Sequence, residues 1–339
     1  MKAFGYRTPG PIDAPESLVA LELPVPQPGP RDIRVAVQAI SVNPADVKLR
    51  ASVRPAGQDY RVLGFDAAGV VDAVGTEVSS FKVGDEVFYA GAINRSGTNA
   101  ELHLVDERIA GRKPRTLSFS EAAALPLTSL TAWEILFERL GVRFGEKRGH
   151  DRLLVINGAG GVGSILLQLA RRLTGLTVIV TASRPESIEW CRKMGAHHVI
   201  DHHSPFLEQL HKKGIDSVRY VAGLTGTDKH LQDIESVLAP QGALALIDDP
   251  AVLDILPLKR KSVSVHWELM FTRSLYQTAD MVEQQHILNE VADLVDAGVL
   301  RTTVTQAVQP INLANLKRVH AFVESGRGIG KSVLTGFEH

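Results

Sequence analysis

The chain of 339 residues has an almost balanced charge, with 37 lysine and arginine residues against 38 aspartate and glutamate residues. A net charge of -1 argues against a polyanionic partner such as nucleic acid. The single cysteine, Cys191, excludes an intramolecular disulfide and a cysteine-rich zinc lobe. The start of the sequence lacks a signal-peptide pattern, and no apolar stretch is long enough to span a bilayer, so we expect a cytoplasmic protein.

The length of the chain predicts two domains, because a single hydrophobic core stops growing at a few hundred residues. Short β-rich runs separated by glycine and proline occupy the first 110 residues and predict a compact β barrel. These runs lie at 34–40, 69–75, 85–91 and 100–105. Helical sequence begins at Ser118.

From Asp151 onward, strands and helices alternate. The predicted strands are 152–156, 177–182, 197–201, 219–224 and 243–248. The predicted helices between them are 162–173, 184–194, 205–214 and 228–238. This alternation is typical of a doubly wound parallel sheet. One more β run follows at 262–267, and residues 280–339 are expected to form two helices and two strands that return to the first domain.

A glycine turn lies between the first predicted strand of this region and the helix that follows it. Gly158, Gly160 and Gly163 match the dinucleotide pattern, in which the glycines allow a tight turn, close approach of a pyrophosphate and close helix packing. The helix N-terminus attracts phosphate, so we include Gly161 and Val162 among the cofactor-binding residues. A glycine turn without a ligand is the alternative.

The end of the second strand predicts which dinucleotide binds. NAD-binding domains carry an acid there, but this sequence has none before Glu186. Ser183 and Arg184 can instead donate hydrogen bonds to a 2′-phosphate, which favours NADP(H). Ser183 can also cap the next helix in a capping box with Glu186, and both roles are compatible.

Further candidate residues follow the fourth and fifth strands, at the carboxyl ends where such sheets bind ligands. They are Leu224, Thr225, Ile247 and Asp248. Four histidines also gather near the third strand. Neighbouring residues on a strand point to opposite faces, so at most alternate members could share a metal, and we interpret the group as solvated imidazoles. They are His197, His198, His202 and His203.

Five segments together resemble the medium-chain dehydrogenase/reductase superfamily, and within it the zinc-independent quinone oxidoreductases. They are 41–50, 62–91, 122–136, 155–171 and 326–337. The run 266–281 resembles a subgroup labelled zinc-type alcohol dehydrogenase-like. The resemblance implies a GroES-like β-barrel catalytic domain (1–127, completed by 271–339) and a Rossmann NADP-binding domain (128–270).

Alcohol dehydrogenases of this superfamily hold a catalytic zinc with a cysteine, a Gly-His-Glu segment and a later cysteine or acid. Asn43 stands where the resemblance places the first cysteine, and Phe65 stands in place of the histidine. Two of the three usual ligands are therefore missing, and we expect no zinc. Asp66 keeps only the place of the neighbouring acid, and we expect it to hydrogen-bond to backbone or to a basic neighbour such as Arg61.

The resemblance also implies roles for residues outside the glycine turn. In "NPAD", Asn43 would hydrogen-bond a substrate carbonyl or carboxamide and Asp46 would lie beside it, with an Asx turn or a helix cap as the alternative. Tyr60 would line the pocket mouth or pack on the barrel, and Thr128 would reach the nicotinamide side of the cofactor. Arg327 and Lys331 would lie near the cofactor cleft or in a solvated basic loop.

We therefore expect an NADPH-dependent reductase that transfers hydride to a quinone or another conjugated carbonyl compound without zinc. Such acceptors need only a hydrogen bond and a proton from solvent, whereas an unactivated carbonyl needs a Lewis acid or general acid. The edge strand 262–267 resembles the one that pairs in family dimers, so we expect a homodimer. The alternatives are a zinc-type alcohol dehydrogenase and a non-catalytic NADPH-binding, structural or nucleic-acid-binding protein.

Overall fold

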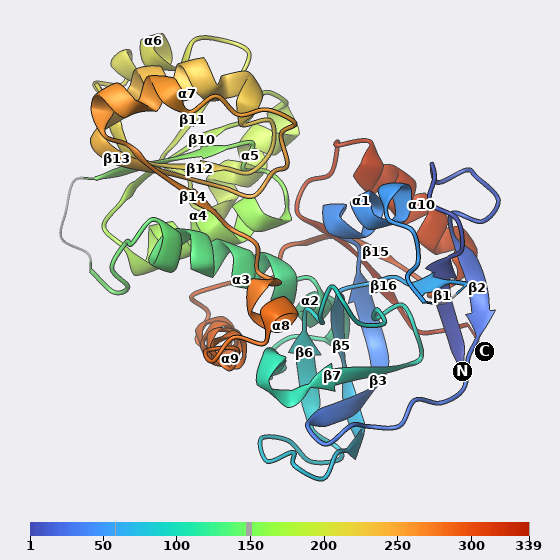
Figure 1. The fold of residues 1–339 in the computed structure, drawn as a ribbon. Coiled ribbons are helices and arrows are strands. Elements are labelled where there is room, and N and C mark those ends of the chain that lie inside the picture. The colour runs from blue at the N-terminus through green and yellow to red at the C-terminus, as the bar shows by residue number, and fades with distance from the viewer. Residues whose placement is uncertain (58, 147–150, 339) are drawn as a thin grey trace. The chain divides into compact units, whose positions relative to one another are not determined.

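The computed structural model describes residues 1–57, 59–146 and 151–338. The chain forms two compact units (Figure 1). Unit 1 comprises Met1–Leu130 and Phe271–His339, and unit 2 comprises Thr131–Met270. Helix α3 (Pro126–Trp133) carries the chain from unit 1 into unit 2.

Unit 2 is built on a six-stranded parallel sheet with the order β11-β10-β9-β12-β13-β14. This order is that of a doubly wound nucleotide-binding sheet, and it confirms the predicted α/β class. The strands are β9 (Arg152–Ile156), β10 (Thr177–Thr181), β11 (His198–Ile200), β12 (Val218–Gly223), β13 (Leu238–Leu246) and β14 (Ser264–Trp267). Helices cover both faces, and Figure 1 shows α6 and α7 on one side of the sheet and α4 on the other.

The helices of unit 2 follow the predicted alternation: the first begins one residue earlier than predicted, and the other three are shorter than predicted. They are α4 (Gly161–Leu173), α5 (Pro185–Met194), α6 (Phe206–His211) and α7 (Leu231–Val237), with the 3-10 helices η3 (Asp228–His230) and η4 (Leu256–Lys261) and the π-helix η2 (Glu134–Arg139). Ile165, Leu166 and Leu169 of α4 are fully buried, as their common helical face predicts. The last four residues of β9 are also fully buried, which explains the continuous apolar run of that strand.

Unit 1 contains a seven-stranded sheet and a three-stranded sheet. The strands are β1 (Lys2–Tyr6), β2 (Val19–Glu22), β3 (Asp32–Ser41), β4 (Arg61–Val62), β5 (Asp66–Val74), β6 (Glu86–Tyr89), β7 (Leu102–Asp106), β8 (Ala110–Arg112), β15 (Val304–Val308) and β16 (Lys331–Thr335). An isolated bridge joins Ala3 of β1 to Ala100, which lies two residues before β7. Phe4 of β1 and Val35 of β3 belong to one shared core, so the sheets enclose a common apolar interior.

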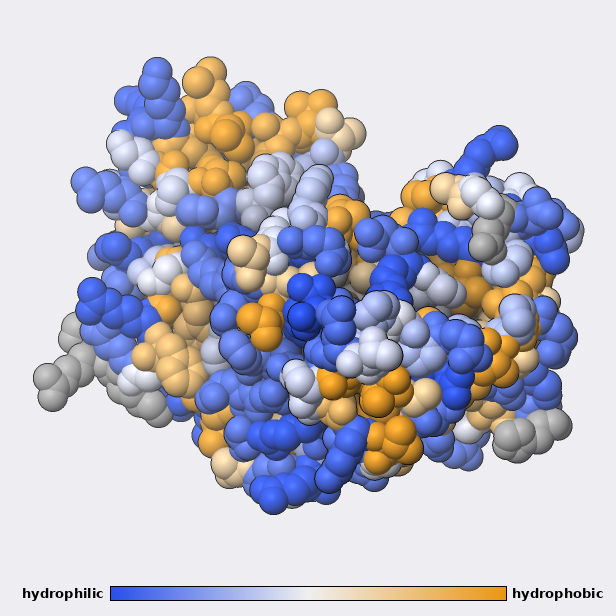
Figure 2. All heavy atoms as spheres, turned by 60° about the horizontal axis from the view of Figure 1, so that its bottom comes forward, coloured by the Kyte–Doolittle hydropathy of each residue, from blue (hydrophilic) through white to orange (hydrophobic). Residues whose placement is uncertain are grey.

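The C-terminal segment completes the larger sheet of unit 1, because β16 pairs antiparallel with β3 and parallel with β15. The helices of this unit are α1 (Pro44–Ser52), α2 (Phe119–Ala123), α8 (Thr272–Tyr276), α9 (Glu283–Asp296) and α10 (Leu313–Glu324), with the 3-10 helix η1 (Glu107–Ile109). Among the described residues, no helix has the length and apolar character needed to cross a membrane. Hydrophilic residues are interspersed with hydrophobic ones over the face drawn in Figure 2.

Candidate functional site

The glycine turn of unit 2 begins with a residue that sequence reasoning missed. Asn157 follows β9 with a positive φ of 57°, a conformation that asparagine tolerates better than most residues. Its backbone N–H donates to the Thr181 hydroxyl at 2.8 Å, and its side-chain amide donates to the Thr225 carbonyl at 2.7 Å. Asn157 therefore ties the ends of β9, β10 and β12 together beneath the turn.

The three glycines of the turn differ in what surrounds them. A Cβ atom on Gly158 would lie 2.3 Å from a methyl group of Val180, and one on Gly163 would lie 2.2 Å from the Gly158 carbonyl oxygen. A Cβ on Gly160 would meet no described atom within 4 Å. The first and third glycines are thus required by packing inside the protein. The second leaves the backbone open to a ligand.

Helix α4 starts at Gly161 directly after this open position. Its N-cap residue, Gly160, forms no side-chain cap bond, and the first backbone N–H groups of an α-helix have no intrahelical partner. Such an N-terminus binds phosphate through these N–H groups and the helix dipole. The turn therefore fits the pyrophosphate of a dinucleotide.

The residues after β10 are arranged differently from the predicted capping box. Arg184, not Ser183, is the N-cap of α5, because Pro185 occupies the first helical position, where its fixed φ and missing N–H are favourable. Ser183 is half-buried, and the Arg184 guanidinium, 39% exposed, lies 3.5 Å from the Glu186 carboxylate. Both predicted partners of a 2′-phosphate follow the strand end, and no acid precedes Glu186.

The carboxyl ends of β12 and β13 bring the remaining predicted residues of unit 2 to one edge. Leu224 is buried, and the Thr225 hydroxyl donates to the Leu224 carbonyl at 2.6 Å. Ile247 donates its backbone N–H to Gly223 at 3.1 Å. The Asp248 carboxylate accepts the backbone N–H and the hydroxyl of Thr227, at 2.7 and 2.8 Å, so it stabilises the β12 loop.

A second polar site lies inside unit 1, where three strand ends meet. In the sheet register, Ser41 at the end of β3 pairs with Asp66 at the start of β5, and β16 begins beside them at Lys331. Asp66 is fully buried and accepts hydrogen bonds from the Ser41 hydroxyl at 2.8 Å and the Leu127 backbone N–H at 2.8 Å. We call this group, with Asn43, the Asp66 cluster.

The cation of the Asp66 cluster is Lys331. Its ammonium lies 2.9 Å from Asp66 and also donates to the Asn43 amide oxygen, while the Asn43 amide nitrogen donates to Asp66 at 2.8 Å. Lys331 is 4% exposed, so its alternative placement in a solvated basic loop is wrong. The suggestion that Arg61 pairs with Asp66 is wrong too, because the Arg61 guanidinium donates to the Ile93 carbonyl.

Asp46 lies beside this cluster as a separate buried carboxyl group. Its oxygens accept the backbone N–H groups of Asn43 at 2.8 Å and Gly64 at 2.9 Å. Asn43 is the N-cap of α1, as one of the two predicted roles required. Its side chain belongs to the Asp66 cluster. Burial raises the pKa of Asp46 to about 7, against the opposing effect of the Asn43 N–H and the Lys331 ammonium.

The donor set around Asp66 does not fit a catalytic zinc ion. Phe65 offers only a ring, which packs against Phe271 with centroids 4.7 Å apart. Asp66 and the Asn43 amide oxygen already hold the Lys331 ammonium, which supplies the positive charge there. Zinc requires three nitrogen, sulfur or carboxylate ligands and an open position. The described residues of this cluster provide one such ligand, Asp66, and it is occupied.

The other predicted residues of unit 1 lie outside the Asp66 cluster. Tyr60 packs against the small apolar cluster formed by Ala3, Leu21, Val62 and Ala100, in agreement with the barrel-packing alternative. Thr128 is buried, and its hydroxyl donates to the Leu125 carbonyl at 3.0 Å. Arg327 is exposed in the loop between α10 and β16.

Comparisons with known protein families give matches to the residues of both units. Residues 29–130 match the family described as alcohol dehydrogenase GroES-like domain, and residues 194–334 match the family described as zinc-binding dehydrogenase. A zinc-type alcohol dehydrogenase-like protein of Staphylococcus aureus strain MSSA476 is 39% identical over 339 residues, which cover 98% of this chain and 99% of that protein.

Solved structures resemble the chain over its whole length. A Rhizobium etli CFN 42 protein, provisionally assigned as a zinc-dependent alcohol dehydrogenase, is 55% identical with a TM-score of 0.95, covering 100% of this chain and 99% of that one. The quinone oxidoreductase of Escherichia coli, solved in complex with NADPH, is 25% identical with a TM-score of 0.84, covering 99% and 100%. The names of these relatives thus point to two different reactions, that of an alcohol dehydrogenase and that of a quinone oxidoreductase.

Proposed function

The chain belongs to the medium-chain dehydrogenase/reductase superfamily, and from this premise we propose that it is an NADPH-dependent reductase of quinones or other conjugated carbonyl compounds that works without zinc. The coarser conclusion, an oxidoreductase with a GroES-like domain and a Rossmann sheet, follows from the matches in both units. The finer conclusion, that NADPH is the cofactor and a conjugated carbonyl compound the substrate without zinc, rests on the residues of this chain.

The open glycine turn is the main support for NADPH as the cofactor. When bound, NADPH supplies the hydride. The N–H groups at Gly160–Val162 would hold its pyrophosphate, because this part of the turn is unobstructed and starts a helix. Ser183 and Arg184 would hold the 2′-phosphate, with the guanidinium exchanging its contact with Glu186 for the more highly charged phosphate.

The Asp66 cluster supports the choice of acceptor. Reduction of an unactivated carbonyl needs a Lewis acid or a positioned general acid. The ammonium of Lys331 is buried, and Asp66 and Asn43 already accept its hydrogen bonds, so it is not available as a general acid or hydrogen-bond donor to a substrate carbonyl. Quinones and enones accept hydride more easily, because conjugation delocalises the developing charge. The cluster then serves to order the strand ends around the acceptor site.

Steady-state oxidation of NADPH tests this function. We expect the EDTA-treated enzyme to reduce 1,2-naphthoquinone or an enone, and to use NADPH in preference to NADH. Tight NADPH binding without turnover of either acceptor would identify a nucleotide-binding protein instead. Loss of activity on chelation, with recovery on adding zinc, would identify the zinc-type alcohol dehydrogenase.

Gly160→Ala provides a matched test of the cofactor site. Its φ of -74° suits alanine, and the new methyl group meets no described atom within 4 Å, so the protein should fold normally. The methyl group would instead crowd the pyrophosphate, and we expect an increase of about tenfold in the dissociation constant of NADPH, equivalent to about 1.4 kcal/mol. An unchanged constant would place the nucleotide elsewhere.

We also propose that the protein is a homodimer formed through strand β14. This strand is the sheet edge next to β13, and an open edge is a template for pairing with a second copy. Apolar side chains around it are exposed, including Leu256 at 68% and Trp267 at 57%. Leu256→Asp should shift the molecular mass in light scattering from dimer to monomer, whereas the same mass in both proteins would exclude this interface.

A further inference from the structure

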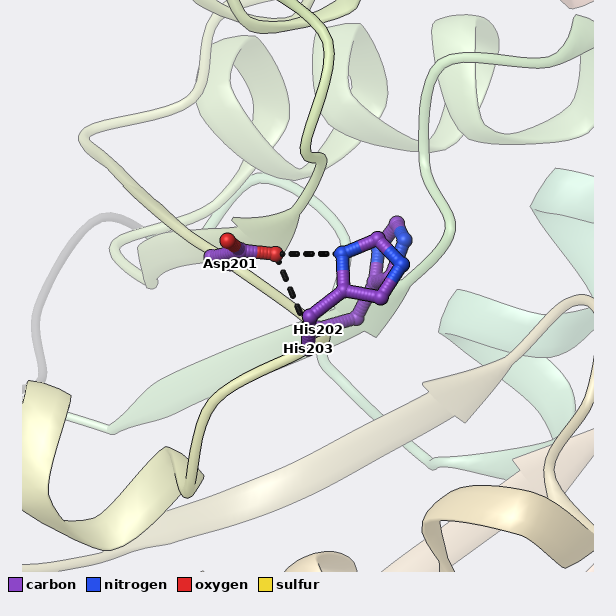
Figure 3. Close-up of side chains that lie close together, drawn as sticks. All are labelled: Asp201, His202 and His203. Carbon is purple, nitrogen blue, oxygen red and sulfur yellow. Dashed lines mark hydrogen bonds and ion pairs between the residues drawn. The ribbon is translucent and has the colours of Figure 1, made fainter.

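The turn after strand β11 brings together three residues with metal-binding side chains. The strand ends at Ile200, so Asp201, His202 and His203 do not follow the alternating geometry of a strand. The expectation that neighbouring histidines here must point to opposite faces is therefore wrong. Figure 3 shows the carboxylate of Asp201 directed toward the ring of His203, with the His202 ring beside it.

The potential ligand atoms of these residues lie within 4.8 Å of one another. The Asp201 carboxylate accepts the backbone N–H of His203 at 2.9 Å and contacts its Nδ1 at 3.0 Å. The rings of His202 and His203 are 4.3 Å apart, and Nδ1 of His202 is buried without a hydrogen-bond partner among the described residues. A buried imidazole nitrogen without a hydrogen-bond partner has a free lone pair or N–H that a ligand can engage.

The conformation of the turn is held by residues that are not ligands. Gln209 accepts the backbone N–H of Asp201 at 2.8 Å and donates to its carbonyl oxygen at 2.8 Å. The ring of His230 lies 5.9 Å from that of His202 and stacks on Phe206 at 5.5 Å.

We propose that Asp201, His202 and His203 bind one divalent transition-metal ion of the zinc type. Two imidazoles and a carboxylate are a donor set that suits zinc, and a cation among them would take the place of the hydrogen bond between Asp201 and His203. The side chains of Asp201 and His203 are 48% and 69% exposed, so water can complete the coordination. Binding requires local movement of these side chains, because zinc ligands are closer together than 4.8 Å in a tetrahedral site.

The site lies in unit 2 next to the residues that follow β10. Thr181 pairs with Ile200, and the Ala182 N–H donates to the Ile200 carbonyl at 3.0 Å. A bound ion would therefore stabilise the sheet edge on which Ser183 and Arg184 are placed. The Asp66 cluster is built from residues of unit 1, so this proposal leaves the argument against a catalytic zinc there unchanged.

Metal titration of the full-length chain without an affinity tag tests the site. After removal of metal with EDTA, we expect Zn²⁺ to bind in calorimetry with a stoichiometry of one per chain, and Co²⁺ to give the visible absorption of a low-coordinate site. The variant combining His202→Asn and His203→Asn should bind Zn²⁺ at least a hundredfold more weakly. His211→Asn removes an exposed histidine of the same unit and should leave the affinity within about twofold.

Asp201→Asn keeps an acceptor oxygen for the His203 N–H and serves as a milder variant if the double variant unfolds. We expect it to weaken Zn²⁺ binding about tenfold, since it removes the charged ligand. Absence of stoichiometric binding, or equal loss in the His211→Asn control, would overturn the proposal. The readout is independent of NADPH oxidation, so its failure and that of the proposed reductase activity are distinguishable.

Discussion

Arg184 provides the sharpest test of the cofactor preference. It follows strand β10 at the N-cap of α5, and we propose that its guanidinium binds the 2′-phosphate, the only group that distinguishes NADPH from NADH. Arg184→Ala should therefore weaken NADPH binding and leave NADH binding almost unchanged. The N-cap role depends on the backbone, since no side-chain cap bond is formed by Arg184, so the helix should persist.

The expected size of the effect follows from the surroundings of Arg184. A hydrogen bond to a charged group contributes about 1.5–3 kcal/mol. The guanidinium is 39% exposed, which favours the lower end because solvent screens the contact. It must also exchange its contact with Glu186, a partly exposed ion pair worth about 0.2–1 kcal/mol. The net contribution is about 0.5–1.3 kcal/mol, or about two- to ninefold in the dissociation constant.

Fluorescence titration with both nucleotides measures this difference. Arg192→Ala serves as the control, because it removes an exposed arginine from the last turn of the same helix. We expect the control to bind both nucleotides as the unaltered protein does. Equal weakening of NADPH and NADH by Arg184→Ala would refute specific recognition of the phosphate. A native protein that binds NADH as tightly as NADPH would refute the preference itself.

Three further predictions concern the buried groups. Lys331→Met leaves the Asp66 carboxylate unpaired and should lower the free energy of unfolding by about 3–5 kcal/mol in urea, with recovery in the double variant that adds Asp66→Asn; a loss below 1 kcal/mol would contradict the pairing. Because the folded pKa of Asp46 is raised from 3.8 to about 7, its protonation contributes stability that is complete below about pH 4 and is lost as the pH rises through 7. The unfolding free energy relative to Asp46→Asn should therefore fall between about pH 4 and pH 7, on the order of 4 kcal/mol at most, and a constant difference would rule out this titration. Gly163→Ala, whose methyl group would meet the Gly158 carbonyl at 2.2 Å, should lower the thermal midpoint by several degrees in calorimetry; an unchanged midpoint would show that the helix can move away at no cost.

The sheet of unit 2 was predictable because its signals are local. Each strand is a short apolar run, each helix has its own periodicity, and the glycines stand where strand β9 meets helix α4. The errors lie at element ends, where one residue decides the outcome. Pro185 moves the helix cap from Ser183 to Arg184, and the end of β11 at Ile200 releases His202 from the strand geometry. In unit 1, β1 and β2 carried too weak a pattern to be predicted.

The Asp66 cluster was only half predictable, for a reason that lies in sheet pairing. The lone acid in an apolar run implies a buried partner, but the sequence neighbour Arg61 was the wrong choice. Lys331 stands 265 positions away and reaches Asp66 because β16 returns to pair with β3. No local pattern carries that information. The loop that precedes Lys331 is rich in glycine, which favoured an exposed basic loop over a buried strand start.

On the proposed function, the buried ammonium group of Lys331 stands where a catalytic zinc would be expected, which would explain how a chain with relatives named for zinc favours another acceptor. A zinc ion with an open position can polarise a substrate oxygen directly. The Lys331 ammonium has the same sign of charge, but Asp66, Asn43 and the Val42 carbonyl accept its hydrogen bonds, and it is 4% exposed. Its charge therefore stabilises the packing of the ends of β3, β5 and β16 against one another. A reductase built this way would depend on the acceptor for activation, and this is the reason for proposing conjugated carbonyl compounds as its substrates.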